Sequence, residues 1–231
     1  MLRKNYMELN WKPTPPTWLS VLLLMLLLPL GLTLPIEWGW ENGPLENTQV
    51  LVLGCGLAVT LFAARQNCGN RKARNLWRWL ALFWLLCIGR ELSWGRVFYQ
   101  VAIGEHGPKF IAIDQLRYGF LVNPVTILLA LIMLVGICRN GPLTYLRRTE
   151  LPAWDIIVFI LAAGLNVWFE KGASTIPFLY LQEEVLEEWA ELAAYWSLVS
   201  IAIAGYKNYF PFGRGMVNRQ GFGNATPPMG E

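Results

Sequence analysis

The sequence predicts an all-α fold, a polytopic membrane bundle of six transmembrane helices with both termini in the cytoplasm. The first observation behind this prediction is composition. Of the 231 residues, 55% are hydrophobic and 15% are charged, with a mean hydropathy of +0.36. Ordinary soluble domains carry about 25% charged residues, so this composition is typical of a membrane protein. The small net charge of +3 argues against a nucleic-acid partner.

The second observation is a series of long apolar runs separated by polar loops. A membrane-spanning helix needs about 20 apolar residues, and its backbone must be hydrogen-bonded within the lipid. The first run resembles a signal peptide but is longer than a typical apolar core and lacks a cleavage site, so we interpret it as a retained span. The expected spans cover residues 17–35, 47–64, 77–92, 121–138, 153–169 and 185–206.

These spans form one predicted domain over residues 1–209, followed by a flexible cytoplasmic tail over residues 210–231 that is rich in Gly and Pro. The longest outer connection, residues 94–120, is long enough to include a re-entrant or interfacial helix. None of the four cysteines lies on the outer side, so no disulfide framework is expected.

The third observation is the distribution of charge between the two sides. Alternating loops place fourteen of the nineteen Lys and Arg residues on one side, and the positive-inside rule makes that side cytoplasmic. Localisation in the bacterial inner membrane, with membrane lipids as partners, is therefore expected. Twelve of the sixteen acids fall on the outer side. Because insertion depends little on acids, function is a candidate cause.

Five of these acids form a stripe within residues 183–191, at the start of the last span. On a helix Glu183, Glu184, Glu187, Glu188 and Glu191 share one face. One interpretation is a solvated collar that complements the helix dipole. Like charges four residues apart repel, however, and acids inside a span usually have a functional role. The alternative is therefore one wall of an outward-facing acidic pocket, whose polar face ends at Tyr195.

Other spans are expected to bring polar groups to the same membrane level. Glu46 begins the second span, and Arg90 and Glu91 close the third. Asn166 and Glu170 lie four residues apart on the fifth. Each of these also has a purely structural interpretation, as a dipole-stabilising acid, an internal ion pair or a helix–helix hydrogen bond.

Several carboxylates in one low-dielectric space cannot all be ionised unless cations join them. Arg90, Arg96 and Arg117 are candidates, and so is a metal. An all-oxygen site suits a hard divalent cation such as Mg²⁺, Mn²⁺ or Ca²⁺, and the candidate metal ligands are Glu91, Glu184, Glu188 and Glu191.

Most catalytic signatures are absent, and the single histidine excludes paired-histidine zinc and di-iron helices. Paired acids can still perform general acid/base chemistry, for which Glu191, Glu188 and Glu91 are the candidates. Whether the protein is an enzyme stays open. The candidate ligand-binding residues are Glu46, Arg90, Glu91, Trp94, Arg96, Glu170, Glu184, Glu187 and Tyr195.

Two short motifs resemble a group of small uncharacterised bacterial multi-pass inner-membrane proteins. Residues 41–46 fit an E-x-G-x-x-E pattern before the second span, and residues 91–95 fit an E-[LI]-S-W-G pattern at the end of the third. That group often carries a Glu-Glu pair where this chain has Arg90-Glu91. The resemblance implies no activity, but it implies that the two motifs belong to one site.

Three functional hypotheses follow. The leading one is an outward-facing carboxylate-rich pocket that binds a cation or metal together with a lipid headgroup or small polar ligand, with the further option of a membrane-embedded enzyme. The second is a secondary transporter of a cation or small solute. The third is an assembly subunit whose acidic collar docks a basic periplasmic or membrane protein partner.

Overall fold

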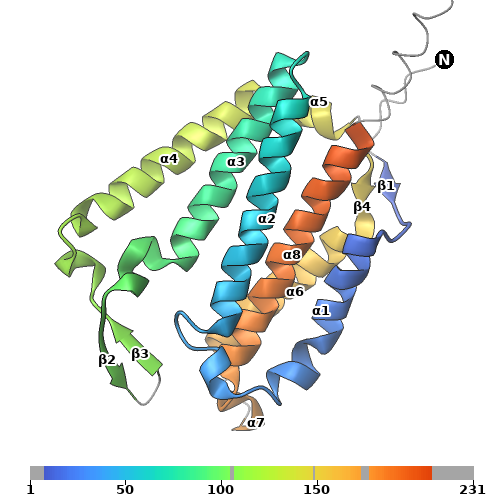
Figure 1. The fold of residues 1–231 in the computed structure, drawn as a ribbon. Coiled ribbons are helices and arrows are strands. Elements are labelled where there is room, and N and C mark those ends of the chain that lie inside the picture. Colours follow the sequence, from blue (N-terminus) through green and yellow to red (C-terminus); the bar gives the residue numbers. More distant parts are fainter. Residues whose placement is uncertain (1–7, 105–106, 148, 173–176, 210–231) are drawn as a thin grey trace, which may run out of the picture.

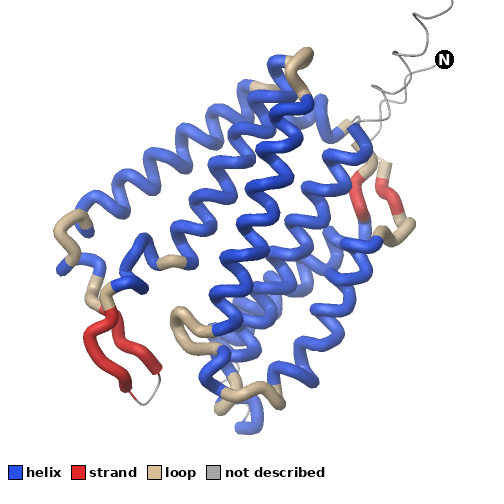
Figure 2. Tube along the Cα trace, viewed as in Figure 1, coloured by secondary structure: helices blue, strands red, loops and turns tan. Residues whose placement is uncertain are grey.

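The computed structural model describes residues 8–104, 107–147, 149–172 and 177–209, and these residues form a bundle of long helices (Figures 1 and 2). The helical class predicted from the sequence is confirmed. The α-helices are α1 (Pro15–Gly31), α2 (Pro44–Gln66), α3 (Arg71–Glu91), α4 (Gly119–Arg139), α5 (Pro142–Leu146), α6 (Ala153–Gly172), α7 (Pro177–Tyr180) and α8 (Glu183–Tyr209).

Two small strand pairs lie at opposite ends of the bundle (Figure 1). Strand β1 (Leu9–Asn10) pairs in parallel with β4 (Leu151–Pro152), with Leu9 opposite Leu151. Strands β2 (Gln100–Gly104) and β3 (Gly107–Phe110) form an antiparallel hairpin. Short 3-10 turns complete the described chain: η1 (Ile36–Trp38), η2 (Ser93–Phe98) and η3 (Ile113–Gln115).

The outer connection between α3 and α4 is long enough for an interfacial helix, but it is built differently. Its described residues, 93–104 and 107–115, form η2, strands β2 and β3, and η3. Gly104 at the end of β2, Gly107 at the start of β3 and Pro108 disfavour a helix. Val101 and Ile103 favour a strand. The predicted flexible tail, residues 210–231, lies outside the described residues.

Helix α8 occupies the centre of the bundle because it packs against α1, α2 and α6. Small residues make this close approach possible: Ala190 and Ala193 of α8 and Ala162 of α6 are fully buried. Helix α3 packs on α2 and on α4, so that α4, α3, α2 and α8 follow one another across the bundle (Figure 1). The acidic start of α8 therefore lies at the same end as the start of α2 and the end of α3.

Among the described residues, three helices are long and apolar enough to cross a membrane: α2, α4 and the Ala153–Lys171 part of α6. Helix α1 is apolar but shorter. Helices α3 and α8 each contain several charged side chains, which lowers their hydropathy. Large apolar side chains are exposed along α4, among them Ile127, Leu131, Leu134 and Val135. Such a surface suits lipid rather than water, in agreement with the membrane class predicted from the sequence.

The contact between α2 and α3 gives a test of the fold. A methyl group added at Gly56 would lie 2.7 Å from the ring of Trp84, whereas Gly54 has open space around it. We expect Gly56→Ala to lower the free energy of unfolding by about 1–3 kcal/mol through overpacking. Gly54→Ala should leave it unchanged or raise it by up to about 1 kcal/mol. Unfolding in mixed dodecyl sulfate micelles measures both, and equal effects would contradict the packing described.

Candidate functional site

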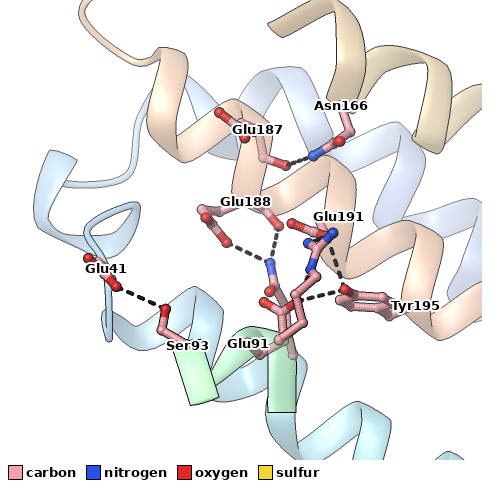
Figure 3. A network of polar contacts seen from close by, with 10 residues as sticks. Glu41, Glu91, Ser93, Asn166, Glu187, Glu188, Glu191 and Tyr195 are labelled. Carbon is pink, nitrogen blue, oxygen red and sulfur yellow. Dashed lines mark hydrogen bonds and ion pairs between the residues drawn. The ribbon is translucent and has the colours of Figure 1, made fainter. Parts of the chain in front are cut away.

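The structure divides the acidic stripe of α8 between two neighbours. Glu187 is close to α6: Asn166 Nδ2 donates to its backbone oxygen at 3.5 Å, and its carboxylate is repelled by Glu170. Glu188 and Glu191 interact instead with residues of α2 and α3. The stripe is therefore not one uniform wall, and only part of it joins the network in Figure 3.

The centre of that network is a tyrosine between two carboxylates. Tyr195 Oη donates to Glu91 Oε1 at 2.6 Å and to Glu191 Oε1 at 3.0 Å. Glu91 is 5% exposed and Glu191 14%. Figure 3 shows both carboxylates directed at the Tyr195 hydroxyl. Because a hydroxyl has one proton, the two carboxylates share a single donor here.

Arg90 supplies positive charge to the same two oxygens. Its Nε donates to Glu91 Oε1 at 3.0 Å, and its Nη2 pairs with Glu191 Oε1. The arginine side chain is 62% exposed, so it reaches the pair from the solvent-accessible side. The sequence prediction of Arg90 as an internal counter-charge therefore has a geometric basis, with Glu91 and Glu191 as the two partners.

Glu188 has a different partner, Gln49 of α2. Gln49 Nε2 donates to the Glu188 carboxylate at 2.7 Å and to the Glu188 backbone oxygen at 2.8 Å. Gln49 is 0% exposed, and its Oε1 has no hydrogen-bond partner among the described residues. Gln49 was not among the site residues predicted from the sequence. Its position three residues after Glu46, on the same face of the helix, could have indicated it.

Glu46 occupies the same region. Its carboxylate accepts a hydrogen bond from the backbone N–H of Asn42, whose φ is 60°. It is also close enough to Glu91, Glu41 and Glu191 to be repelled by all three. Glu188 is likewise repelled by Glu191, Glu46 and Glu91. We call Glu46, Glu91, Glu188 and Glu191, with Arg90, Tyr195 and Gln49, the carboxylate cluster.

A second group of contacts joins the two motifs singled out in the sequence. Ser93 Oγ donates to Glu41 Oε1 at 3.0 Å, and Arg96 pairs with the same oxygen. Residues Ser93, Trp94 and Gly95 have φ values of 43°, 56° and 92°. This left-handed turn folds the Trp94 ring back over Gly89. Non-glycine residues in this conformation each cost about 1–3 kcal/mol and often lie at functional sites.

Two predicted site residues, Glu170 and Glu184, have exposed side chains, and both repel the carboxylate of Glu187. Within the described ranges, no group of three or more His, Cys, Asp or Glu side chains could hold a metal ion. The expected metal ligands are therefore not assembled. Glu184 is exposed, Glu188 bonds to Gln49, and Glu91 and Glu191 are held by Arg90 and Tyr195.

Two other features lie apart from the carboxylate cluster. A recess of about 450 Å³ lies at the start of α4, lined by Ile113, Asp114, Gly119, Phe120 and Asn123. At the far end of the bundle, Asp155 is fully buried and accepts hydrogen bonds from Thr17 at 2.7 Å and Ser20 at 2.6 Å. Nothing in the sequence neighbourhood of Asp155 reveals the two hydroxyls on α1, so the sequence alone does not predict this contact.

Comparison with known proteins identifies no family. No family model, no curated protein and no solved structure matches the chain. The resemblance carried by residues 41–46 and 91–95 therefore stays a prediction, although the structure does bring Glu41 into contact with Ser93 and Arg96.

The shared tyrosine gives a test of the cluster. Tyr195→Phe removes a donor from two largely buried carboxylates, so the free energy of unfolding should fall by about 1.5–3 kcal/mol. Tyr118→Phe is the matched control, because its exposed hydroxyl donates to the Trp94 oxygen at 3.3 Å. The control should change stability by less than about 0.5 kcal/mol. Thermal unfolding in detergent measures both, and similar losses would rule out a special role for Tyr195.

Proposed function

We propose that the chain is a six-span protein of the bacterial inner membrane that binds a cationic small molecule or lipid headgroup from the outer side. The six spans are α1, α2, α3, α4, α6 and α8, with both termini in the cytoplasm. The positive-inside distribution of Lys and Arg supports this orientation. So does the arrangement in Figure 1, in which α1 begins and α8 ends at the same end of the bundle.

The observation that carries the functional proposal is the imbalance of charge in the carboxylate cluster. Arg90 contributes one positive charge beside four carboxylates, of which Glu91 and Glu191 are directly paired with it. Glu46 and Glu188 receive neutral donors, a backbone N–H and the Gln49 amide. Such an excess of acid in a low-dielectric environment is costly, and a bound cation offsets it.

An organic ammonium fits this arrangement better than a divalent metal. A divalent ion needs several oxygens converging on one point at about 2.0–2.6 Å, and the described residues form no such group. An ammonium has three hydrogen-bond donors at longer distances, which suits carboxylates that already accept other bonds. In this proposal Glu188 and Glu191 contact the ligand, and Glu91 holds Tyr195 and Arg90 in place.

Substitution of Glu191 tests this function directly. In purified protein in maltoside detergent, we expect Glu191→Gln to weaken ethanolamine binding at least about tenfold, because one full charge is lost. Glu188→Gln, which can still accept from Gln49, should weaken it similarly. Glu183→Gln, the same change on the same helix, is the control. Saturation-transfer NMR measures the affinities.

A parallel calorimetric titration with Mg²⁺ separates the two kinds of cation. Ethanolamine binding that is unchanged in Glu191→Gln would refute the proposed site. Tight Mg²⁺ binding with no ethanolamine binding would instead favour the hard divalent cation that the sequence suggests.

The topology is testable through the cysteines. Cys68 is exposed in the turn between α2 and α3, on the proposed cytoplasmic side, and Ala102 is exposed in the hairpin on the outer side. We expect a membrane-impermeant maleimide to label Ala102→Cys in intact spheroplasts, and Cys68 only after the membrane is opened. Labelling of Cys68 in intact spheroplasts would invert the proposed orientation.

A transporter is the second candidate, and Asp155 is the observation that favours it. Asp155 is buried at the start of α6, and Glu91 is buried at the opposite end of the bundle, where α3 ends, so the bundle holds buried carboxylates near both ends. Transport requires a polar route between them, and Leu198, Val199 and Ile203 pack in the apolar cluster below Tyr195. Ethanolamine uptake into proteoliposomes that is lost in Asp155→Asn would support transport, whereas binding without uptake would favour the first proposal.

A further inference from the structure

We infer that the ligand is a zwitterion that carries an ammonium group and a phosphate group a few bonds apart, as in phosphoethanolamine. The ammonium is bound by the carboxylate cluster, and the phosphate by Arg96 and Trp40 beside it. This inference rests on the proposed function for the ammonium and adds a second, anionic subsite.

The ammonium side is supported by an unsatisfied acceptor. The amide of Gln49 is oriented by the two bonds that its Nε2 donates to Glu188. Its Oε1 is therefore left as a buried acceptor, and it has no partner within the described residues. A buried acceptor without a donor destabilises the protein. An ammonium placed beside Glu188 can donate to this oxygen and remove that cost.

The phosphate side is supported by two unsatisfied donors. Arg96 Nε and Trp40 Nε1 are both buried, and neither has a hydrogen-bond partner in the part of the chain that the structure describes. The rest of each side chain is fixed in place. Arg96 pairs through Nη2 with Glu41, and the Trp40 ring packs closely against Gly107. Phosphate oxygens are strong acceptors for N–H donors of this kind.

The two subsites are adjacent. Trp40 precedes Glu41 in the chain, and Glu41 is the carboxylate that pairs with Arg96. Glu46 is close enough to Glu41, Glu91 and Glu191 to be repelled by all three, so the two groups are near each other. Figure 3 likewise shows Glu41 and Ser93 next to Glu91 and Glu188. A ligand whose opposite charges are a few bonds apart can therefore contact both.

The charge pattern also explains why neither a simple anion nor an ammonium alone would satisfy both subsites. A simple anion placed at Arg96 would be repelled by Glu41, Glu46 and the carboxylate cluster. An ammonium alone would satisfy Gln49 and the acids but leave the Arg96 and Trp40 donors without acceptors. A zwitterion satisfies both sets at once. Two sources provide this chemistry: the headgroup of an aminophospholipid such as phosphatidylethanolamine, and a free phosphorylated amino alcohol.

The experiment compares ethanolamine with phosphoethanolamine in the full-length protein. Maltoside detergent is required, because phosphocholine detergents would themselves compete for the site. We expect wild type to bind phosphoethanolamine at least about tenfold more tightly than ethanolamine. Arg96→Gln and Trp40→Phe should reduce this preference to about threefold or less while leaving the ethanolamine affinity within about twofold. Trp40→Phe keeps an aromatic ring and removes the Nε1 donor. A loss of preference in both variants therefore cannot be attributed to misfolding of Arg96→Gln alone.

Arg117→Gln is the matched control, since Arg117 is an exposed arginine on the same outer side and its loss should leave the preference intact. Ethanolamine bound as tightly as phosphoethanolamine would overturn the inference and leave the proposed function standing. Binding of neither compound would refute both. A preference lost equally in Arg117→Gln would reduce the effect to general electrostatics and would also overturn the inference.

A further arm identifies the source of the ligand. Nanodiscs that contain phosphatidylethanolamine should abolish phosphoethanolamine binding if the lipid headgroup occupies the site, whereas nanodiscs of phosphatidylglycerol alone should not. If neither lipid competes and phosphoethanolamine still binds with the expected preference, the ligand is the soluble compound. Both results uphold the zwitterion and differ only in where it comes from.

Discussion

The candidate site depends on the hydroxyl of Tyr195, which is held between Glu91 and Glu191. This contact joins the last residue of α3 to the middle of α8. Arg90 donates to the same two oxygens, so the side chains of Tyr195 and Arg90 each contact both carboxylates. Carboxylates this close repel each other strongly when water is scarce. The shared donors are therefore what allows α3 and α8 to bring acids together at this end of the bundle.

The polar groups of the site fall into two classes with different roles. The oxygens of Glu91 and Glu191 that face Tyr195 already have charge-assisted hydrogen bonds, and they set the geometry. Gln49 Oε1, Arg96 Nε and Trp40 Nε1 are buried and have no hydrogen-bond partner among the residues that the structure describes. Each lowers the stability of the empty protein, and proteins tend to keep such groups where function requires them. The paired oxygens of the first class fix the geometry of the cluster. The unpaired atoms of the second class are the basis of the proposed ligand contacts.

The sequence predicted the helices well and the connections poorly. The six long apolar runs overlap α1, α2, α3, α4, α6 and α8, because long apolar stretches favour regular hydrogen-bonded helices. The connection between α3 and α4 is long enough for an interfacial helix but contains a hairpin, because its alternating apolar residues have the period of a strand. Helix periodicity placed all five stripe acids on one face. It could not show that Glu187 lies near α6 while Glu188 and Glu191 lie near α2 and α3.

Contacts between helices distant in sequence were not predictable from the pattern. Tyr195 was recognised only as a possible partner of Glu191, four residues away, whereas its shorter bond goes to Glu91 on another helix. Gln49 was overlooked because a single amide in an apolar span has many interpretations. Asp155 illustrates the same limit, since its hydroxyl partners Thr17 and Ser20 lie more than a hundred residues away.

The position of α1 has a consequence for how the chain matures during synthesis. Helix α1 is synthesised before α6 and α8, yet it packs against both. Strand β1 likewise pairs with β4, just before α6. Thr17 and Ser20 therefore lack the carboxylate that accepts their hydrogen bonds until Asp155 has been synthesised. The contacts of α1 with α6 and α8 can form only after these later helices have been made, so this part of the bundle assembles late.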